Sequence, residues 1–340
     1  MTTRVRSHAK INLGLAIGPV RRDGYHGLAT IYQTLAIHDF VEVTATRLAD
    51  GALSQVTITC SDERVPCDAR NTCWRIVERA LERMKISAQV AIHIEKRLPV
   101  QGGLGGGSAN AAAALIGLEK ELQGPLPQSE RLAIAAETGS DVPLFLIGGT
   151  VLGLGRGEQV APLPDLPEIP CVLAVPGVGV STPQAFRDWD RRQAEIAQNK
   201  LTAAAGSDRL EQLGRMWAAA LDRAQELHAN ATGVFPAGAE EDRAGNLLLE
   251  LVRAGIENDF ESVVFTQYPS LRGILETLKN ETHAETAAVY AALSGSGSAL
   301  FGLYRMVADS CAAGKRLAEQ GVPALETKTI GRAEYWRGMV

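Results

Sequence analysis

Five glycines between Gln101 and Ser108 are the residues with the clearest chemical potential in this sequence. They are Gly102, Gly103, Gly105, Gly106 and Gly107. Without side chains, the backbone N–H groups of such a loop can approach an anion closely and adopt positive φ where needed. An alanine-rich helix that begins near Ser108 or Ala109 would direct its unpaired amides and positive dipole end at the same anion. The stretch therefore predicts a phosphate-binding loop.

A linker or one of the two familiar nucleotide loops would fit these glycines less well. A flexible linker is not normally bounded by an alternating strand and a strong helix former. No lysine follows the glycines, so the loop is not a Gly-x-x-x-x-Gly-Lys-Ser/Thr phosphate loop. Counting from Gly103 gives Gly-x-Gly-x-x-Ser, which is not the dinucleotide fingerprint. The pattern indicates a third kind of nucleotide loop.

Two groups with acid–base or electrostatic potential lie far from the loop in sequence. Segment 8–17 alternates like a strand and places Lys10 and Asn12 opposite its apolar residues. Lysine and asparagine are common on exposed strand faces, and the segment alone favours that interpretation. Asp141 lies between small residues at an expected helix-to-strand junction. It is either a catalytic base or a turn aspartate that accepts from its own backbone.

Aromatic candidates flank two loops. Tyr25 and His26 follow the turn signal Asp23-Gly24, and they could cap a core or stack on a planar ligand. The sequence leaves both possibilities open. Thr182 and Phe186 stand out in a later loop that runs into a helix and could face a substrate.

The elements that must hold these residues alternate between strand and helix patterns. In the first half, strands are expected at 8–17, 30–37, 40–46, 55–60 and 90–94, with helices from Asn71 to Met84, after Ser108 and at 128–138. Prolines over 162–170 indicate a boundary. Beyond it, helices are expected at 210–227, 246–256, 271–279 and 307–319, and strands from 171 and at 287–293, 299–304 and 325–330.

A second glycine-rich segment, Ser294 to Ser298, separates two of these expected strands. It is too compact to be only a linker. We expect it to back the first glycine loop or the substrate pocket.

Composition limits the classes of protein. The chain has 340 residues, more than one core usually supports, so two domains are expected. A formal charge of −5 argues against nucleic acid or an anionic membrane as a partner. The five cysteines lack metal-site spacing, so reduced and mostly buried thiols are expected. The N-terminus lacks an apolar core of signal-peptide length, and we expect a cytoplasmic protein.

Five motifs resemble those of the GHMP kinases, a superfamily that includes galactokinase, homoserine kinase and mevalonate kinase. They are Ala9 to Leu13, Asp23 to His26, Lys96 to Ser108, Gly139 to Pro143 and Leu293 to Ser298. The first two motifs are most similar to members that act on a cytidine-diphosphate-linked methylerythritol.

The resemblance implies a two-domain α+β fold with the active site between the domains. An N-terminal α/β domain over 1–160 would carry the glycine loop, and a ferredoxin-like α+β domain would span 161–340. Region 190–245 resembles nothing in the family and would be an insertion. The activity implied is ATP-dependent phosphorylation of the 2-hydroxyl of the methylerythritol unit, with Mg²⁺. A homodimer is left open.

Site roles follow from the same resemblance. Asp141 would take the hydroxyl proton, and Lys10 would orient the hydroxyl or offset charge in the transition state. The substrate would be held by Asn12, Tyr25, His26, Thr182 and Phe186. ATP would be bound by Asn71, Lys96, Pro99, Gly102, Gly103, Leu104, Gly105, Gly106, Gly107, Ser108, Ala109 and Asn110, with Ser108 also a candidate ligand for Mg²⁺. Thr72 departs from the family, because an apolar residue is usual at its position.

Two rival classes remain. A GHMP kinase for another alcohol, of mevalonate or homoserine type, would keep the loop and Asp141 but would not need Tyr25 and His26. A non-catalytic sensor of the same fold would usually lose Lys10 or Asp141, and both are present. The cytidine-linked substrate is therefore the first prediction.

Overall fold

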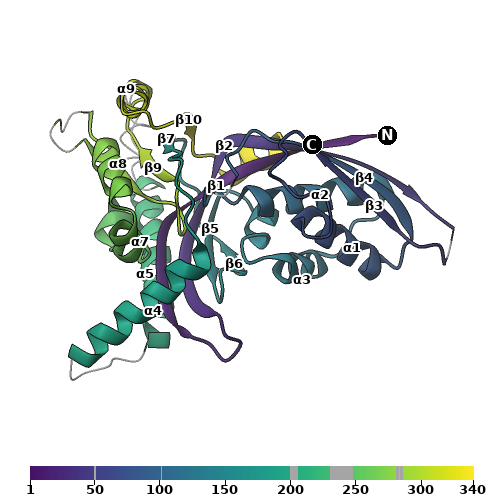
Figure 1. The fold of residues 1–340 in the computed structure, drawn as a ribbon, viewed down its shortest axis with the longest axis horizontal. Coiled ribbons are helices and arrows are strands. Elements are labelled where there is room, and N and C mark those ends of the chain that lie inside the picture. The colour runs from purple at the N-terminus through teal and green to yellow at the C-terminus, as the bar shows by residue number, and fades with distance from the viewer. Residues whose placement is uncertain (50, 101, 200–205, 230–247, 281–282, 284–285) are drawn as a thin grey trace.

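The structure, a computed structural model, describes residues 1–49, 51–100, 102–199, 206–229, 248–280, 283 and 286–340. It contains two sheets with helices packed on them (Figure 1). The larger sheet has six strands in the order β3-β4-β2-β5-β6, with β1 paired to β2. The smaller has four strands in the order β10-β7-β9-β8.

The first sheet is built around a long antiparallel pair. Its strands are β1 (Thr3–Val20), β2 (His26–Arg47), β3 (Gln55–Cys60), β4 (Ala88–Glu95), β5 (Thr150–Leu154) and β6 (Gln159–Pro162). Strand β2 is continuous where the sequence predicted two strands, at 30–37 and 40–46. Register shifts between His8 and Lys10 and between Asn12 and Gly14 break the β1–β2 ladder. They lie at the two polar residues singled out above.

Three helices and a short 3-10 turn pack on the first sheet. They are α1 (Thr72–Met84), α2 (Gly106–Leu122), α3 (Gln128–Thr138) and η1 (Pro143–Leu146). Asn71 caps α1 by accepting from the Cys73 amide at 2.8 Å, as its residue type predicted. The small residues of α2 allow it to lie directly on β2, because a Cβ added at Gly117 would come within 2.9 Å of Val43 Cβ. The run after Asp141 is η1 rather than a strand.

The second sheet is covered on both faces. Its strands are β7 (Pro170–Ala174), β8 (Tyr290–Leu293), β9 (Leu300–Leu303) and β10 (Ala324–Lys328). One apolar cluster joins it to α7 (Glu261–Gln267), α8 (Pro269–Lys279) and α9 (Val307–Glu319). A second cluster lies between this sheet, β1 and α5 (Gly206–Ala229). Helix α4 (Thr182–Asn199) precedes α5.

Region 190–245 contributes to the core where it is described. Trp217 and Leu221 of α5 are buried in the cluster that contains Ile11 and Leu13 of β1. A Cβ added at Gly14 would lie 3.4 Å from the Trp217 ring, so β1 and α5 pack closely. This part of the region is therefore structural. Residues 200–205 and 230–247 lie outside the described residues.

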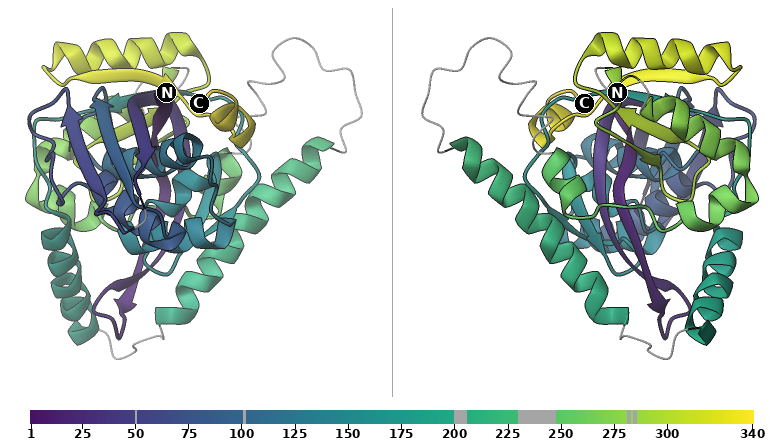
Figure 2. Two further views of the ribbon diagram at one scale, coloured as in Figure 1. Left: turned by 90° about the vertical axis from the view of Figure 1, so that its right-hand side faces the viewer. Right: turned by 90° about the vertical axis from the view of Figure 1, so that its left-hand side faces the viewer.

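The chain ends on the first sheet's side of the molecule. Helix α10 (Arg332–Arg337), which the sequence analysis missed, follows β10. Tyr335 and Met339 belong to the same apolar cluster as Phe145. The Arg6 amide donates to the Met339 carbonyl at 2.8 Å, so the two termini lie together (Figure 2). The expected division of domains at residue 160 remains a prediction, and residues 330–340 pack with the first sheet.

All five cysteines are free thiols, but only Cys73 and Cys171 are fully buried. The sequence predicted that most of the thiols would be buried, and two of the five are. Within the described ranges, the helices lack either the length or the apolar character that crossing a membrane requires.

Candidate active site

The glycine loop forms the wall of a cavity of about 390 Å³. Helix α2 begins at Gly106, two residues earlier than the helix start predicted at Ser108, with Gly105 as its N-cap at φ +73°. The Ala109 amide makes the first bond of the helix, to the Gly105 carbonyl at 2.9 Å. The amides of Gly106, Gly107 and Ser108 are therefore the unpaired donors of the first turn. Such a terminus binds phosphate readily.

Two of the glycines are required by close neighbours. Gly103 has φ +74°, and a Cβ there would overlap the Ser294 carbonyl oxygen. At Gly105 a Cβ would lie 2.9 Å from Lys10 Cγ and 2.9 Å from Phe145 Cζ. The loop is therefore packed from both sides.

The segment Ser294 to Ser298 supports this loop, as the sequence predicted. The Ser294 hydroxyl donates to the Gly103 carbonyl at 3.0 Å, and the Ala299 amide donates to the Gly102 carbonyl at 3.1 Å. Asn258 in turn donates to the Leu293 carbonyl at 2.8 Å. The expected support of the first loop is therefore confirmed, and Gly295 and Ser296 also line the neighbouring cavity.

Three of the residues expected to bind ATP lie outside the glycine loop but line the same cavity. They are Asn71, Lys96 and Pro99. The Asn71 side chain is engaged at the start of α1, where it also donates to the Pro66 carbonyl at 2.7 Å. Thr72, the departure from the family pattern, donates to the Gly107 carbonyl at 2.7 Å and so ties α1 to the loop.

Lys96 is held by a buried carboxylate that the sequence analysis missed. Asp39 is fully buried and forms an ion pair with the Lys96 ammonium at 2.5 Å. It also accepts from the amides of Arg97 and Leu98, at 2.7 Å each. Asn110 donates to Asp39 at 3.0 Å, so its side chain serves this network. Asp39 therefore anchors both ends of the loop.

Ala109 is the one expected ATP-binding residue that does not line the cavity. It is buried within α2, and its amide is used by the helix. A direct contact between its side chain and a nucleotide is not supported by this geometry.

Lys10 and Asp141 meet on the other side of the loop. Lys10 Nζ lies 3.3 Å from Asp141 Oδ2 and donates to Asn12 Oδ1 at 2.6 Å. Lys10 and Asn12 are only 3% and 2% exposed, so the exposed-face interpretation of this strand is wrong. The loop covers the face, because the Lys10 amide donates to the Leu104 carbonyl at 3.0 Å.

Asp141 bonds to side chains rather than acting as a simple turn residue. The Tyr32 hydroxyl donates to Asp141 Oδ1 at 3.0 Å. Burial, together with the Asp141 charge, raises the pKa of Tyr32 well above its ordinary value, so the hydroxyl remains a donor. The Asp141 side chain stays 31% exposed and can be reached from the cavity. Tyr32 lies opposite Asn12 where β1 and β2 pair. The sequence alone does not reveal this pairing.

A second cavity of about 640 Å³ brings the expected acceptor residues together. It is lined by Lys10, Asn12, Tyr25, His26, Asp141, Thr182 and Phe186, among others. The His26 and Phe186 rings stack at 4.8 Å with 7° between their planes. Thr182 and Ser296 share a hydrogen bond of 2.6 Å between their hydroxyls.

Tyr25 lies apart from that stack, at the rim of the second cavity. Its side chain is 56% exposed, with the Arg156 guanidinium 5.0 Å from its ring centroid. The sequence analysis missed Arg156 and also Asp190, whose carboxylate lies 3.4 Å from His26 Nε2. The three expected aromatic residues therefore form a stacked pair and a separate rim residue.

The glycine loop separates the two cavities and belongs to both. Gly103 and Gly105 line each of them. An anion held by the loop amides would therefore face the Lys10–Asp141 pair. One carboxylate, one ammonium and an amide cradle are suited to phosphoryl transfer, which depends mainly on positioning and electrostatics.

The described residues include no group of three or more His, Cys, Asp or Glu side chains that could hold a metal ion. Ser108 lines the first cavity at the start of α2. Its hydroxyl oxygen is the candidate Mg²⁺ ligand that the sequence analysis named.

Comparison with known proteins agrees with this geometry. The model of the GHMP kinases N terminal domain matches residues 71–149, and that of the GHMP kinases C terminal domain matches 241–319. The 4-diphosphocytidyl-2-C-methyl-D-erythritol kinase of Solibacter usitatus is 35% identical over 89% of this chain and 83% of its own. That of Pseudarthrobacter chlorophenolicus is 33% identical over 95% and 91%.

A solved structure resembles the whole chain. A 4-(cytidine 5'-diphospho)-2C-methyl-D-erythritol kinase crystal structure superposes with a TM-score of 0.66 at 25% identity, covering 97% of this chain and all of its own.

Proposed function

The chain belongs to the GHMP kinases, among the 4-diphosphocytidyl-2-C-methyl-D-erythritol kinases, and we propose that Lys10 and Asp141 carry its phosphoryl transfer. It has the two-domain α+β fold of that family, as the sequence predicted. As a kinase of this family it uses ATP to phosphorylate 4-diphosphocytidyl-2-C-methyl-D-erythritol, in isoprenoid precursor synthesis. Its residue roles, metal use and location are proposals.

On the ATP side, we propose that the first-turn amides of α2 bind the β- and γ-phosphates. This proposal is supported by the backbone amides of Gly106, Gly107 and Ser108, which have no hydrogen-bond acceptor within the helix. The adenine end would lie near Asn71, Lys96 and Pro99, which line the same cavity.

On the acceptor side, Asp141 would accept the proton of the 2-hydroxyl. The Tyr32 hydroxyl would hold the carboxylate in place, and Lys10 would orient the acceptor and stabilise charge in the transition state. Asn12 and Thr182 would contact polar groups of the substrate, and Tyr25, His26 and Phe186 its base. The Asp141 carboxylate is accessible, as a general base must be.

Mg²⁺ also fits the residues present. Mg²⁺ in kinase sites is commonly held by substrate phosphates with few protein ligands, which agrees with Ser108 as the candidate donor. When bound, it would offset phosphate charge. We also propose a cytoplasmic location, to which five free thiols are suited.

One observation carries this assignment of roles. The loop that offers the phosphate donors forms a wall of the cavity that holds Lys10 and Asp141, through Gly103 and Gly105. A phosphoryl group bound by the loop amides would therefore lie next to the acceptor residues.

The test is turnover of ATP with the cytidyl substrate, with mevalonate and homoserine as control alcohols. We expect phosphorylation of the cytidyl substrate alone. The variant Asp141→Asn should bind both ligands but lose roughly 10²-fold or more in kcat. Phosphorylation of only a control alcohol would overturn the substrate assignment, and unchanged turnover in the variant would remove Asp141 from the reaction.

A further inference from the structure

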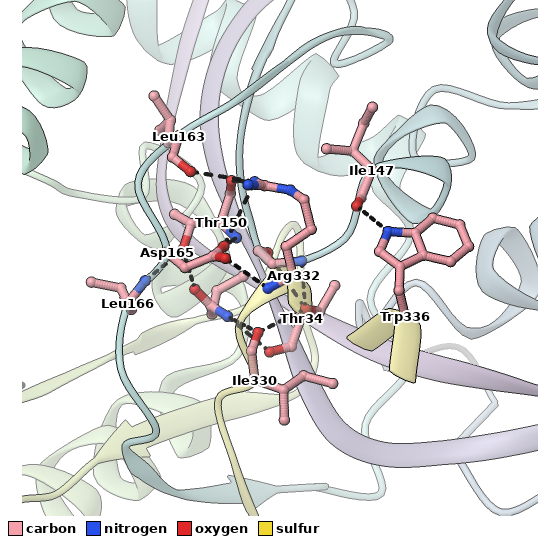
Figure 3. A network of polar contacts seen from close by, with 11 residues as sticks. Thr34, Ile147, Thr150, Leu163, Asp165, Leu166, Ile330, Arg332 and Trp336 are labelled. Atoms are coloured by element: carbon pink, nitrogen blue, oxygen red, sulfur yellow. Dashed lines mark hydrogen bonds and ion pairs between the residues drawn. The ribbon is translucent and has the colours of Figure 1, made fainter. Parts of the chain in front are cut away.

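The last helix of the chain contacts the segment that follows Asp141. The Tyr335 hydroxyl donates to the Phe145 carbonyl at 2.7 Å, in a buried setting. The Trp336 indole N–H donates to the Ile147 carbonyl at 2.8 Å (Figure 3). Both acceptors lie within six residues of Asp141, although the donors are about 190 residues further along the chain.

A second set of bonds fixes the start of α10. The Arg332 amide donates to Asp165 Oδ2 at 2.7 Å, and the Thr150 amide donates to Asp165 Oδ1 at 3.0 Å (Figure 3). The Arg332 guanidinium also donates to the Thr150 carbonyl at 3.1 Å. The helix is therefore bonded along its length to residues 145–150.

Two glycines between these bonds allow the close approach. Gly148 and Gly149 have φ of +74° and +73°. A Cβ at Gly148 would overlap the Tyr335 ring, and a Cβ at Gly149 would overlap the Asp165 carboxylate. The backbone here is shaped to receive α10.

The same segment packs beside the glycine loop through Phe145, at the point where the loop meets Lys10. The Phe145 ring lies 2.9 Å from the position that a Cβ at Gly105 would occupy, next to the Lys10 side chain. A shift of the Phe145 backbone would therefore be transmitted to the loop and to Lys10. A shift of η1 would also move Asp141, which lies two residues before its start.

We propose that Tyr335 and Trp336 are positioning residues for the phosphoryl transfer. By holding the Phe145 and Ile147 carbonyls, they set the distance between Asp141, Lys10 and the glycine loop. The proposal rests on the proposed function. The new proposal adds a role in the reaction for the last helix of the chain, which lines neither cavity.

The structure offers a matched control. Tyr304 is also buried, its hydroxyl donates to the Leu278 carbonyl at 2.7 Å beside the second sheet, and it lines neither cavity. Tyr335→Phe and Tyr304→Phe each remove one buried hydroxyl and leave one carbonyl without its donor. A purely structural role would give the two variants the same behaviour.

The experiment measures kcat, KM for both substrates and Tm for each variant. We expect similar losses in Tm for both. For Tyr335→Phe we expect kcat to fall roughly 5- to 20-fold with KM for ATP nearly unchanged, because a small misplacement of reacting groups is costly. Tyr304→Phe should retain its kcat.

Trp336→Phe provides a second test that does not depend on a buried residue. The Trp336 side chain lies at the surface, so its replacement should fold, and we expect a smaller fall in kcat. Equal kcat in the wild type and in both α10 variants would overturn the inference, as would equal losses in Tyr335→Phe and Tyr304→Phe. An inactive wild type would instead contradict the proposed function.

Discussion

The glycine loop and the aromatic end of the second cavity are built in different ways. Around the loop, backbone groups bond to other backbone groups and to the buried side chains of Asp39 and Ser294. At the aromatic end, a stacked pair of rings meets the half-exposed Tyr25. From this difference we infer that the loop geometry is fixed before ligands bind, while the aromatic end adjusts through Tyr25. Changes at the loop should affect stability and kcat, and changes at the aromatic end should affect KM.

The largest effect expected within this comparison is that of Gly103→Ala. A side chain there requires a left-handed backbone and overlaps the Ser294 carbonyl, so the two glycine segments must separate. We expect a clear loss of Tm and a fall in kcat of roughly 10²-fold, because the loop moves relative to Lys10. Steady-state kinetics and thermal unfolding measure both.

Gly273→Ala is the control for this substitution. Gly273 lies in α8 with open space around a Cβ, so the same change should stabilise the helix by about 1 kcal/mol and leave kcat alone. Equal Tm values for the two variants would contradict a tightly packed loop.

A smaller effect at the loop is expected from Asp39→Asn. The change removes the buried counter-ion of Lys96 and weakens the bonds to the Arg97 and Leu98 amides. Breaking a buried pair typically costs about 3 kcal/mol, which denaturant unfolding would measure. We also expect KM for ATP to rise, since Lys96 lines the cavity that we propose for ATP.

Asp62→Asn tests the same chemistry at the surface. Asp62 pairs with the exposed Arg64, where solvent screens the interaction, so stability should hardly change. If the two aspartate variants lost the same stability, Asp39 would not be the anchor of the loop.

The sequence predicted those elements whose signals are local. Helix α3 has the predicted bounds, α1 starts at its Asn71 cap, and β3 ends as its alternation indicated. The glycine loop was also recognisable, because five glycines directly before a helix are typical of an anion-binding helix terminus.

The partners of these elements could not be predicted in the same way. Tyr32 and Asp39 look like ordinary members of a strand, and their roles depend on contacts with residues 57 to 109 positions away. Helix α10 is short, and its bonds reach back about 190 residues. Lys10 and Asn12 looked exposed because the loop that covers them comes much later in the chain. Register and packing, rather than composition, decide such contacts.

The smallest effect, and the one that tests the adjustable side of the comparison, is expected from Phe186→Ala. Its ring stacks on His26 and lines the cavity that we propose for the acceptor, and none of the contacts described above joins it to Lys10 or Asp141. Loss of a stacking surface should raise KM for the cytidyl substrate roughly 10-fold while kcat stays within a factor of about two. Tyr268→Ala, which removes a ring from the edge of the apolar cluster that joins the second sheet to α7, α8 and α9, should leave KM unchanged. An unaltered KM in Phe186→Ala would move the base contact elsewhere. A fall in kcat alone would instead show that the aromatic end shares the fixed geometry of the loop.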